Sequence, residues 1–161
     1  MDDIALATLS DELMKDCAVA ADALATAVTR LSVGTPEALD SCGRHLARLF
    51  NVIEQMSLRI AKAFENNIDD ERRWHSELIR RMSIAITGVR PALFPDELGQ
   101  PLHELRSFRH VFNHAYDLRL DPDKLRLLLK YANEVGERLA PLARAFIKGV
   151  AAMHGLTAPS G

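Results

Sequence analysis

The residues best suited to chemistry lie in one short stretch, LRSFRHVFNHAYD, at residues 105–117. It holds two arginines, two histidines, an asparagine and a tyrosine within little more than three helical turns. Arginine presents a planar fork of N–H donors that matches phosphate oxygens. Histidine gains and loses a proton near neutral pH, so it can serve as acid or base. The stretch is therefore a candidate site for phosphate chemistry.

A helical wheel with about 100° per residue sorts this stretch into two faces. The predicted core side holds Leu105, Phe108, Phe112, Ala115 and Tyr116. The opposite side holds His103, His110 and His114, with Arg106 and Asn113 beside them. One face is thus expected to be buried, and the other is rich in imidazole and guanidinium groups.

Arg109 falls at the border between these two faces, in the sector of Tyr116. Arg109 and His114 are about 140° apart on the wheel, so no single stripe holds both. Either the long arginine side chain bends toward the histidine, or a second copy of the chain supplies the missing half. This geometry favours a groove at a two-fold interface over a pocket inside one monomer.

Two other interpretations of the stretch stay open. Polar helix faces are usually just solvated, so the histidines can be incidental. A metal site would use His110 and His114, four residues apart, with His103 further along and a third ligand such as Asp117. No HExxH glutamate accompanies these histidines. We therefore predict no metal ligands.

The elements that position the stretch are predicted to be helices, because no segment of adequate length alternates like a strand. The expected helices run from about Asp3 to Leu31, from Pro36 to Asn66 or Asn67, from Asp69 or Asp70 to Gly88, from near Pro101 through the stretch itself, and from Asp121–Pro122 to about Met153. Thr35 and Asp121 each precede a proline as N-caps, and Gly34 follows the first helix. Pro141 is expected to kink the last helix or to split off a final short one. The predicted fold is all-α, an antiparallel bundle of four to five helices.

Length and charge limit the possible organisation. The 161 residues suit one domain, predicted as residues 1–154, followed by a flexible C-terminal tail at 155–161. Of 22 acidic and 20 basic residues, residues 1–42 carry eight acids and two bases, so the remainder carries fourteen acids and eighteen bases. Nucleic-acid binding would therefore need a local patch. The candidates for it are Arg106, Arg119, Lys124, Arg126 and Lys130.

The compartment is expected to be the cytoplasm. No apolar run reaches the roughly 18 residues of a membrane span, and the acidic start MDDIALATLSDELMKD is unlike a secretory signal. Cys17 and Cys42 fall within helical patterns and are expected to be reduced, buried thiols.

The segment RHVFNHAY matches the pattern R-x4-H-x-Y, with Arg109, His114 and Tyr116 at the fixed positions. The pattern resembles the HEPN superfamily, and more closely its HepT-like ribonuclease toxins. That family commonly has a polar residue after the arginine, and here it is His110. The flanking segments WHSELIRRM, GVRPALF and LHELRSFRHVFNHAY are also similar to one HepT-like branch. The resemblance covers roughly residues 70–130, and the rest of the chain agrees in its helix pattern alone.

The resemblance implies a helical bundle that forms a homodimer, with its two motifs meeting in a cleft. It implies a toxin of a type II/VII-like toxin–antitoxin system, a metal-independent RNA endonuclease with no cofactor. Arg109 and His114 would be catalytic, and His110, Asn113 and Arg106 would orient the RNA. A minimal nucleotidyltransferase antitoxin using Mg-ATP would neutralise it by transferring AMP to Tyr116. The alternative is a catalytically silent HEPN module that binds a nucleotidyltransferase partner or presents its substrate.

Overall fold

The computed structural model describes residues 1–65, 71–115 and 118–159, and of residues 71–76 the backbone alone. These residues form helices α1 (Asp3–Val33), α2 (Pro36–Phe64), α3 (Glu71–Met82), the short 3₁₀ helix η1 (Asp96–Leu98), α4 (Gly99–His114) and α5 (Pro122–His154). No strand occurs within these described ranges; Ile86 and Arg90 form an isolated bridge. The predicted all-α class is confirmed.

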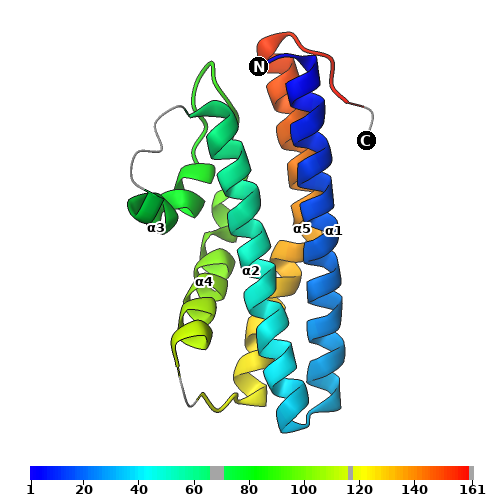
Figure 1. Cartoon of the computed structure of the whole chain (residues 1–161), viewed down its shortest axis with the longest axis vertical. Coiled ribbons are helices and arrows are strands. Elements are labelled where there is room, and N and C mark those ends of the chain that lie inside the picture. Colours follow the sequence, from blue (N-terminus) through cyan, green and yellow to red (C-terminus); the bar gives the residue numbers. More distant parts are fainter. Residues whose placement is uncertain (66–70, 116–117, 160–161) are drawn as a thin grey trace.

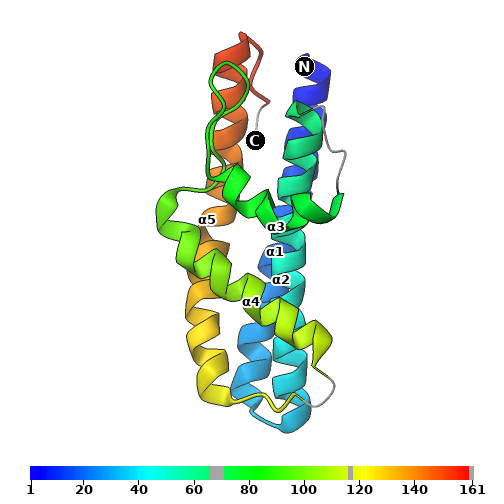
Figure 2. The same ribbon diagram turned by 90° about the vertical axis from the view of Figure 1, so that its left-hand side faces the viewer.

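Three long helices, α1, α2 and α5, form the body of the bundle (Figure 1). Helix α1 packs along both α2 and α5. Helix α4 lies on the outer side of α2 and crosses α2 and α5 obliquely (Figure 2). The shorter α3 packs against α2. The candidate residues therefore lie on an outer helix, α4, that packs against the two long helices α2 and α5.

The predicted helix starts are confirmed by their capping contacts. The hydroxyl of Thr35 accepts a hydrogen bond from the Ala38 N–H at 3.2 Å, and Pro36 opens α2. The carboxylate of Asp121 accepts from the Asp123 N–H at 2.9 Å, and Pro122 opens α5. Such caps satisfy amide groups that the first helical turn leaves without an intrahelical partner.

Several predicted details of the helices need correction. Helix α3 ends at Met82 instead of Gly88, and α4 begins at Gly99 instead of near Pro101. Helix α5 continues through Pro141 to His154, so of the two predicted outcomes, a kink or a split, the split into two helices is wrong. Pro141 is exposed, which leaves its ring and the carbonyl one turn earlier on the solvent side of the helix.

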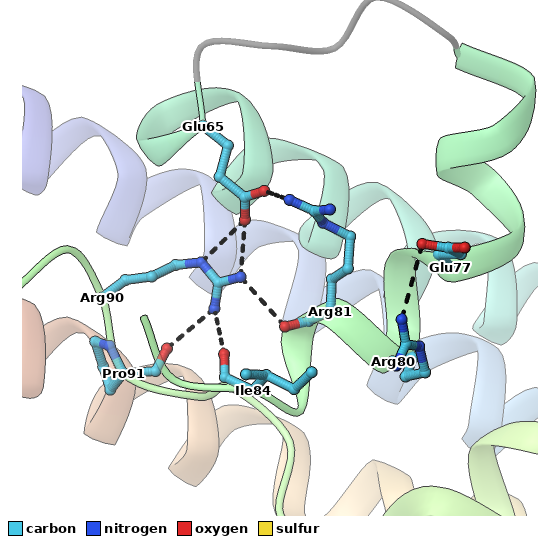
Figure 3. Close-up of polar contacts among 7 residues, drawn as sticks. All are labelled: Glu65, Glu77, Arg80, Arg81, Ile84, Arg90 and Pro91. Atoms are coloured by element: carbon cyan, nitrogen blue, oxygen red, sulfur yellow. Dashed lines mark hydrogen bonds and ion pairs between the residues drawn. The ribbon is translucent and has the colours of Figure 1, made fainter. Parts of the chain in front are cut away.

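The early end of α3 is explained by Arg90, a side chain only 1% exposed (Figure 3). Its guanidinium donates to the carbonyls of Arg81 at 3.2 Å and Ile84 at 3.0 Å. The Met82 carbonyl accepts from the Leu93 N–H at 2.8 Å. These carbonyls are therefore not available for the hydrogen bonds of a longer helix. Gly88 then adopts a left-handed backbone conformation, with φ 73°. The chain reverses here and returns toward α4.

A carboxylate completes the Arg90 cluster. Glu65, at the end of α2, accepts from Arg90 at 2.8 Å and also pairs with Arg81 (Figure 3). Burial by itself raises the pKa of Glu65, but the hydrogen bonds and charges of Arg90 and Arg81 outweigh it and lower that pKa below its ordinary value. The cluster ties the connection between α3 and α4 to α2.

Both cysteines are buried within the bundle, as predicted. Burial raises the pKa of each thiol, Cys17 and Cys42, to about 11. After α5, Leu156 packs on the core and the Thr157 N–H donates to Asp3 at 2.8 Å. The flexibility of residues 155–161 stays a prediction. Among the helices described, none is both long and apolar enough to span a lipid bilayer.

Candidate functional site

Helix α4 packs against α2 through its aromatic residues. The rings of Phe108 and Phe112 stack with their centroids 5.5 Å apart, against a glycine of α2. A Cβ atom at Gly43 would lie 2.8 Å from Phe112 and 3.3 Å from Phe108. Because only a glycine permits this approach, Gly43 sets how closely the two helices pack.

The predicted core side of α4 is partly confirmed. Leu105 is buried, and Phe108 and Phe112 are half-buried. Ala115 is exposed, so its assignment to the core was wrong: the helix ends at His114, and Ala115 already has an extended backbone. Tyr116 lies outside the described residues, so its predicted place at the core border is not tested.

The predicted polar face of α4 is exposed to solvent. His103, His110, Asn113 and His114 are exposed on it, and Arg106 is half-buried. Arg106 and His103 line a hollow of about 300 Å³ between α4 and the end of α3. The rings of His110 and His114 lie 4.5 Å apart between centroids.

His114 has one ring nitrogen fixed by its own helix. Its Nδ1 lies 2.7 Å from the carbonyl oxygen of His110. A carbonyl only accepts hydrogen bonds, so Nδ1 must carry the proton. In the neutral ring, Nε2 then holds the lone pair, on a side chain that is exposed. In this tautomer, Nε2 is the ring nitrogen that can accept a proton from a substrate.

Arg109 points the other way, onto α2. Its Nη1 donates to the Asn51 side chain at 3.0 Å and to Glu54 at 2.5 Å, and its Nη2 donates to Glu54 at 3.3 Å. The guanidinium also lies over the Phe50 ring, 4.8 Å from the ring centroid. The side chain of Arg109 is 20% exposed. The fold thus directs Arg109 and His114 to different sides of α4, as the helical wheel predicted.

The α2 residues that hold Arg109 were not found by reasoning from the sequence. Phe50, Asn51 and Glu54 precede Arg109 by more than fifty positions. Their spacing places them on about one turn of helix, but no sequence pattern identifies α4 as the helix that they face. A polar pair beside the apolar stripe of α2 is the only available signal, and it is weak.

The basic residues suggested for nucleic-acid binding lie in separate places. Arg119 and Lys124 line an apolar hollow of about 420 Å³ between α4 and the start of α5, while Arg106 lines the smaller hollow near α3. Arg126 pairs with Asp123, and Lys130 is exposed. A single chain therefore does not join these five side chains into one pocket.

The described part of the chain offers no support for a metal site. No group of three histidine, cysteine or carboxylate side chains there is arranged to hold a metal ion. Asp117, the third ligand considered for His110 and His114, lies outside the described residues.

Fold and site together define a helical-bundle protein with an arginine and a histidine five residues apart on an outer helix. Residues 41–150, more than half of the chain, match the family model described as HepT-like protein. The chain therefore belongs to the HepT-like family of the HEPN superfamily, whose members are generally ribonucleases of toxin-type modules. The comparisons with curated proteins and with solved structures gave no match.

Proposed function

We propose that this protein is a metal-independent endoribonuclease toxin that acts as a homodimer. The observation that supports this proposal best is how Arg109 and His114 are held on α4, in a chain that belongs to the HepT-like family. A guanidinium fork is fixed at Arg109, and His114 is held in the tautomer that leaves Nε2 able to accept a proton. Metal-independent cleavage of RNA can use both groups, the guanidinium to stabilise charge on the phosphate and the imidazole to accept a proton.

In the proposed reaction, His114 Nε2 accepts the proton of the RNA 2′-hydroxyl while that oxygen attacks the adjacent phosphorus. Arg109 stabilises the negative charge that develops on the phosphate oxygens. The bond from phosphorus to the 5′ oxygen breaks, and the leaving oxygen takes a proton from the imidazolium of the second chain's motif. The products are a 2′,3′-cyclic phosphate and a 5′-hydroxyl. His110, Asn113 and Arg106 orient the substrate.

The test is RNA cleavage by purified variants. Arg109→Ala and His114→Ala should each lower the rate at least about 100-fold, the scale of acid–base and charge stabilisation. Far-UV circular dichroism should show unchanged helix content, since neither side chain lies in the buried core. His103→Ala, on the same exposed face but outside the motif, is the matched control and should stay active. Cleavage should persist in EDTA; activity that is lost in EDTA and restored by zinc would contradict the proposal.

We further propose that a minimal nucleotidyltransferase antitoxin silences the protein by transferring AMP from Mg-ATP to the hydroxyl oxygen of Tyr116, with release of pyrophosphate. Tyr116 stands two residues after His114, so an attached adenylate would place a phosphate and a bulky base close to the motif. Intact-mass spectrometry after incubation with the partner and Mg-ATP should show one added AMP. Tyr116→Phe should show none and should keep its cleavage activity. Inhibition by stoichiometric binding, without an adduct on Tyr116, would contradict the modification.

A second candidate function is a silent module that binds the nucleotidyltransferase. It is favoured by one observation: in the single chain, Arg109 is engaged by Glu54 instead of pointing toward His114. If the native dimer binds the partner but cleaves no RNA, this function replaces the first.

A further inference from the structure

The contacts around Arg109 identify a residue pair outside the R-x4-H motif. Glu54 and Asn51 of α2 bind the outer nitrogens of Arg109, and Phe50 of the same helix lies against the guanidinium face. We propose that Glu54, assisted by Asn51, is a positioning residue that presents the remaining edge of Arg109 to a phosphodiester. This inference rests on the proposed function.

The donors of Arg109 can be counted one by one. A guanidinium has five N–H groups. Both N–H groups of Nη1 are used, one by Asn51 and one by Glu54, and one N–H of Nη2 is used by Glu54. In the part of the chain that the structure describes, no acceptor is recorded for the Nε–H group or for the second N–H of Nη2. These two N–H groups lie on the same edge and point in parallel, which is the geometry of a fork for two phosphate oxygens.

The Phe50 ring fixes the plane of that fork. With the ring centroid 4.8 Å from the guanidinium carbon, and the carboxylate of Glu54 at the far end, the group has little freedom to rotate. Arginine otherwise loses considerable side-chain entropy when it binds an anion. A guanidinium that is already oriented loses less of this entropy, and preorganised charge is what stabilises a transition state.

The opposite role for Glu54 would be competition with the phosphate. A phosphate that displaced Glu54 would have to bind the edge formed by Nη1 and Nη2, which the carboxylate of Glu54 occupies. The edge formed by Nε and Nη2 makes displacement unnecessary, because phosphate and carboxylate can bind different edges at once. The two roles predict opposite signs: loss of Glu54 lowers activity if it positions Arg109 and raises activity if it competes.

The kinetic experiment uses the 161-residue chain and Glu54→Gln, which keeps the shape of the side chain and removes its charge. We expect kcat to fall about 10- to 100-fold, the scale of misplacing a reacting group, with KM changed less than threefold. The matched control is Glu97→Gln, which removes the carboxylate of a more exposed pair with Arg138 at 3.6 Å and should leave kcat unchanged. Asn51→Ala, at an exposed position that the fold tolerates, should lower kcat less than Glu54→Gln does, and it keeps the test valid if Glu54→Gln fails to fold.

A binding experiment separates this inference from the proposed activity. The ¹⁵N-labelled protein is titrated with a 2′-O-methyl RNA hexamer, which cannot be cleaved because it has no free 2′-hydroxyl. The Nε–H resonance of Arg109, assigned from its absence in Arg109→Lys, should shift on titration in the native protein and should not shift in Glu54→Gln. If native protein cleaves no RNA but shows this Glu54-dependent shift, the proposed activity fails and the positioning role stands. No shift in the native protein, an unchanged shift and kcat in Glu54→Gln, or a higher kcat in that variant would each overturn the inference.

Discussion

At the scale of single residues, the histidines of α4 are exposed to solvent, whereas Arg109 on the same helix is held by Glu54 of α2. The exposed histidines followed from helical periodicity alone, because side chains on one face recur every three to four residues. The contact of Arg109 with Glu54 joins residues that are distant in sequence, and periodicity carries no information on such pairs. Ala115 was misplaced for a local reason: a wheel assumes a helix that continues, and α4 stops one residue earlier.

The buried cluster around Glu65 gives a prediction about pH. Since the folded-state pKa of Glu65 lies below its ordinary value of 4.5, its contribution to stability is fully present above that unfolded-state value. The contribution is lost as pH falls through the lower folded-state pKa. Glu65→Gln should therefore reduce the free energy of unfolding by roughly 3 kcal/mol at pH 7, because it leaves the buried Arg90 without its counter-charge.

Urea unfolding at pH 7 and at pH 3 measures this effect. The difference between native protein and Glu65→Gln should shrink at pH 3. Glu77→Gln, which removes the partner of the exposed Arg80, is the control and should change stability little at either pH. A difference between native protein and Glu65→Gln that is the same at both pH values would contradict the assignment.

At the scale of elements, the helix starts were predictable because capping is local. In α2 and α5 an N-cap residue, Thr35 or Asp121, stands directly before a proline at the first helical position, and these two residues define the start of the helix. The end of α3 was not predictable, because a side chain from beyond the helix, Arg90, binds the carbonyl of Arg81 in its last turn and that of Ile84 just after it. The close packing of α4 on α2 was not predicted for the same reason. In the sequence Gly43 is an ordinary helical glycine, and only the fold brings the rings of Phe108 and Phe112 against it.

Gly43→Ala tests how closely α4 must approach α2. Alanine favours a helix over glycine by about 1 kcal/mol, whereas forcing a methyl group into a filled contact costs about 1–3 kcal/mol. With Phe112 only 2.8 Å from the new Cβ atom, we expect the second effect to prevail, with a net loss of up to about 2 kcal/mol and reduced RNA cleavage. Gly99→Ala, at the first position of α4, meets no atom within 4 Å and is the control in urea unfolding. A Gly43→Ala protein as stable and active as the control would show that α4 adjusts freely.

At the scale of the whole molecule, the proposed active site needs two copies of the chain. Arg109 is turned onto α2 and His114 is exposed on another side of α4, so a single chain does not bring the two side chains together. Two-fold symmetry places the same surface of both copies in contact, which would join two motifs in one cleft. Sedimentation at micromolar concentration should therefore give a particle of twice 17.9 kDa; a monomer at that concentration would rule out the shared cleft.

A mixed dimer tests whether the cleft needs both motifs. One native chain is paired with one chain that carries Arg109→Ala and His114→Ala, and the mixed dimer is isolated through two different affinity tags. If each chain had its own complete site, the mixed dimer would keep about half of the native activity, because one of two equal sites survives. In the proposed reaction one histidine acts as base and the other chain's histidine as acid, so loss of one motif removes a proton transfer worth about 100-fold or more. We expect cleavage by the mixed dimer at least about tenfold below the native rate, and a rate near one half would assign a complete site to each chain.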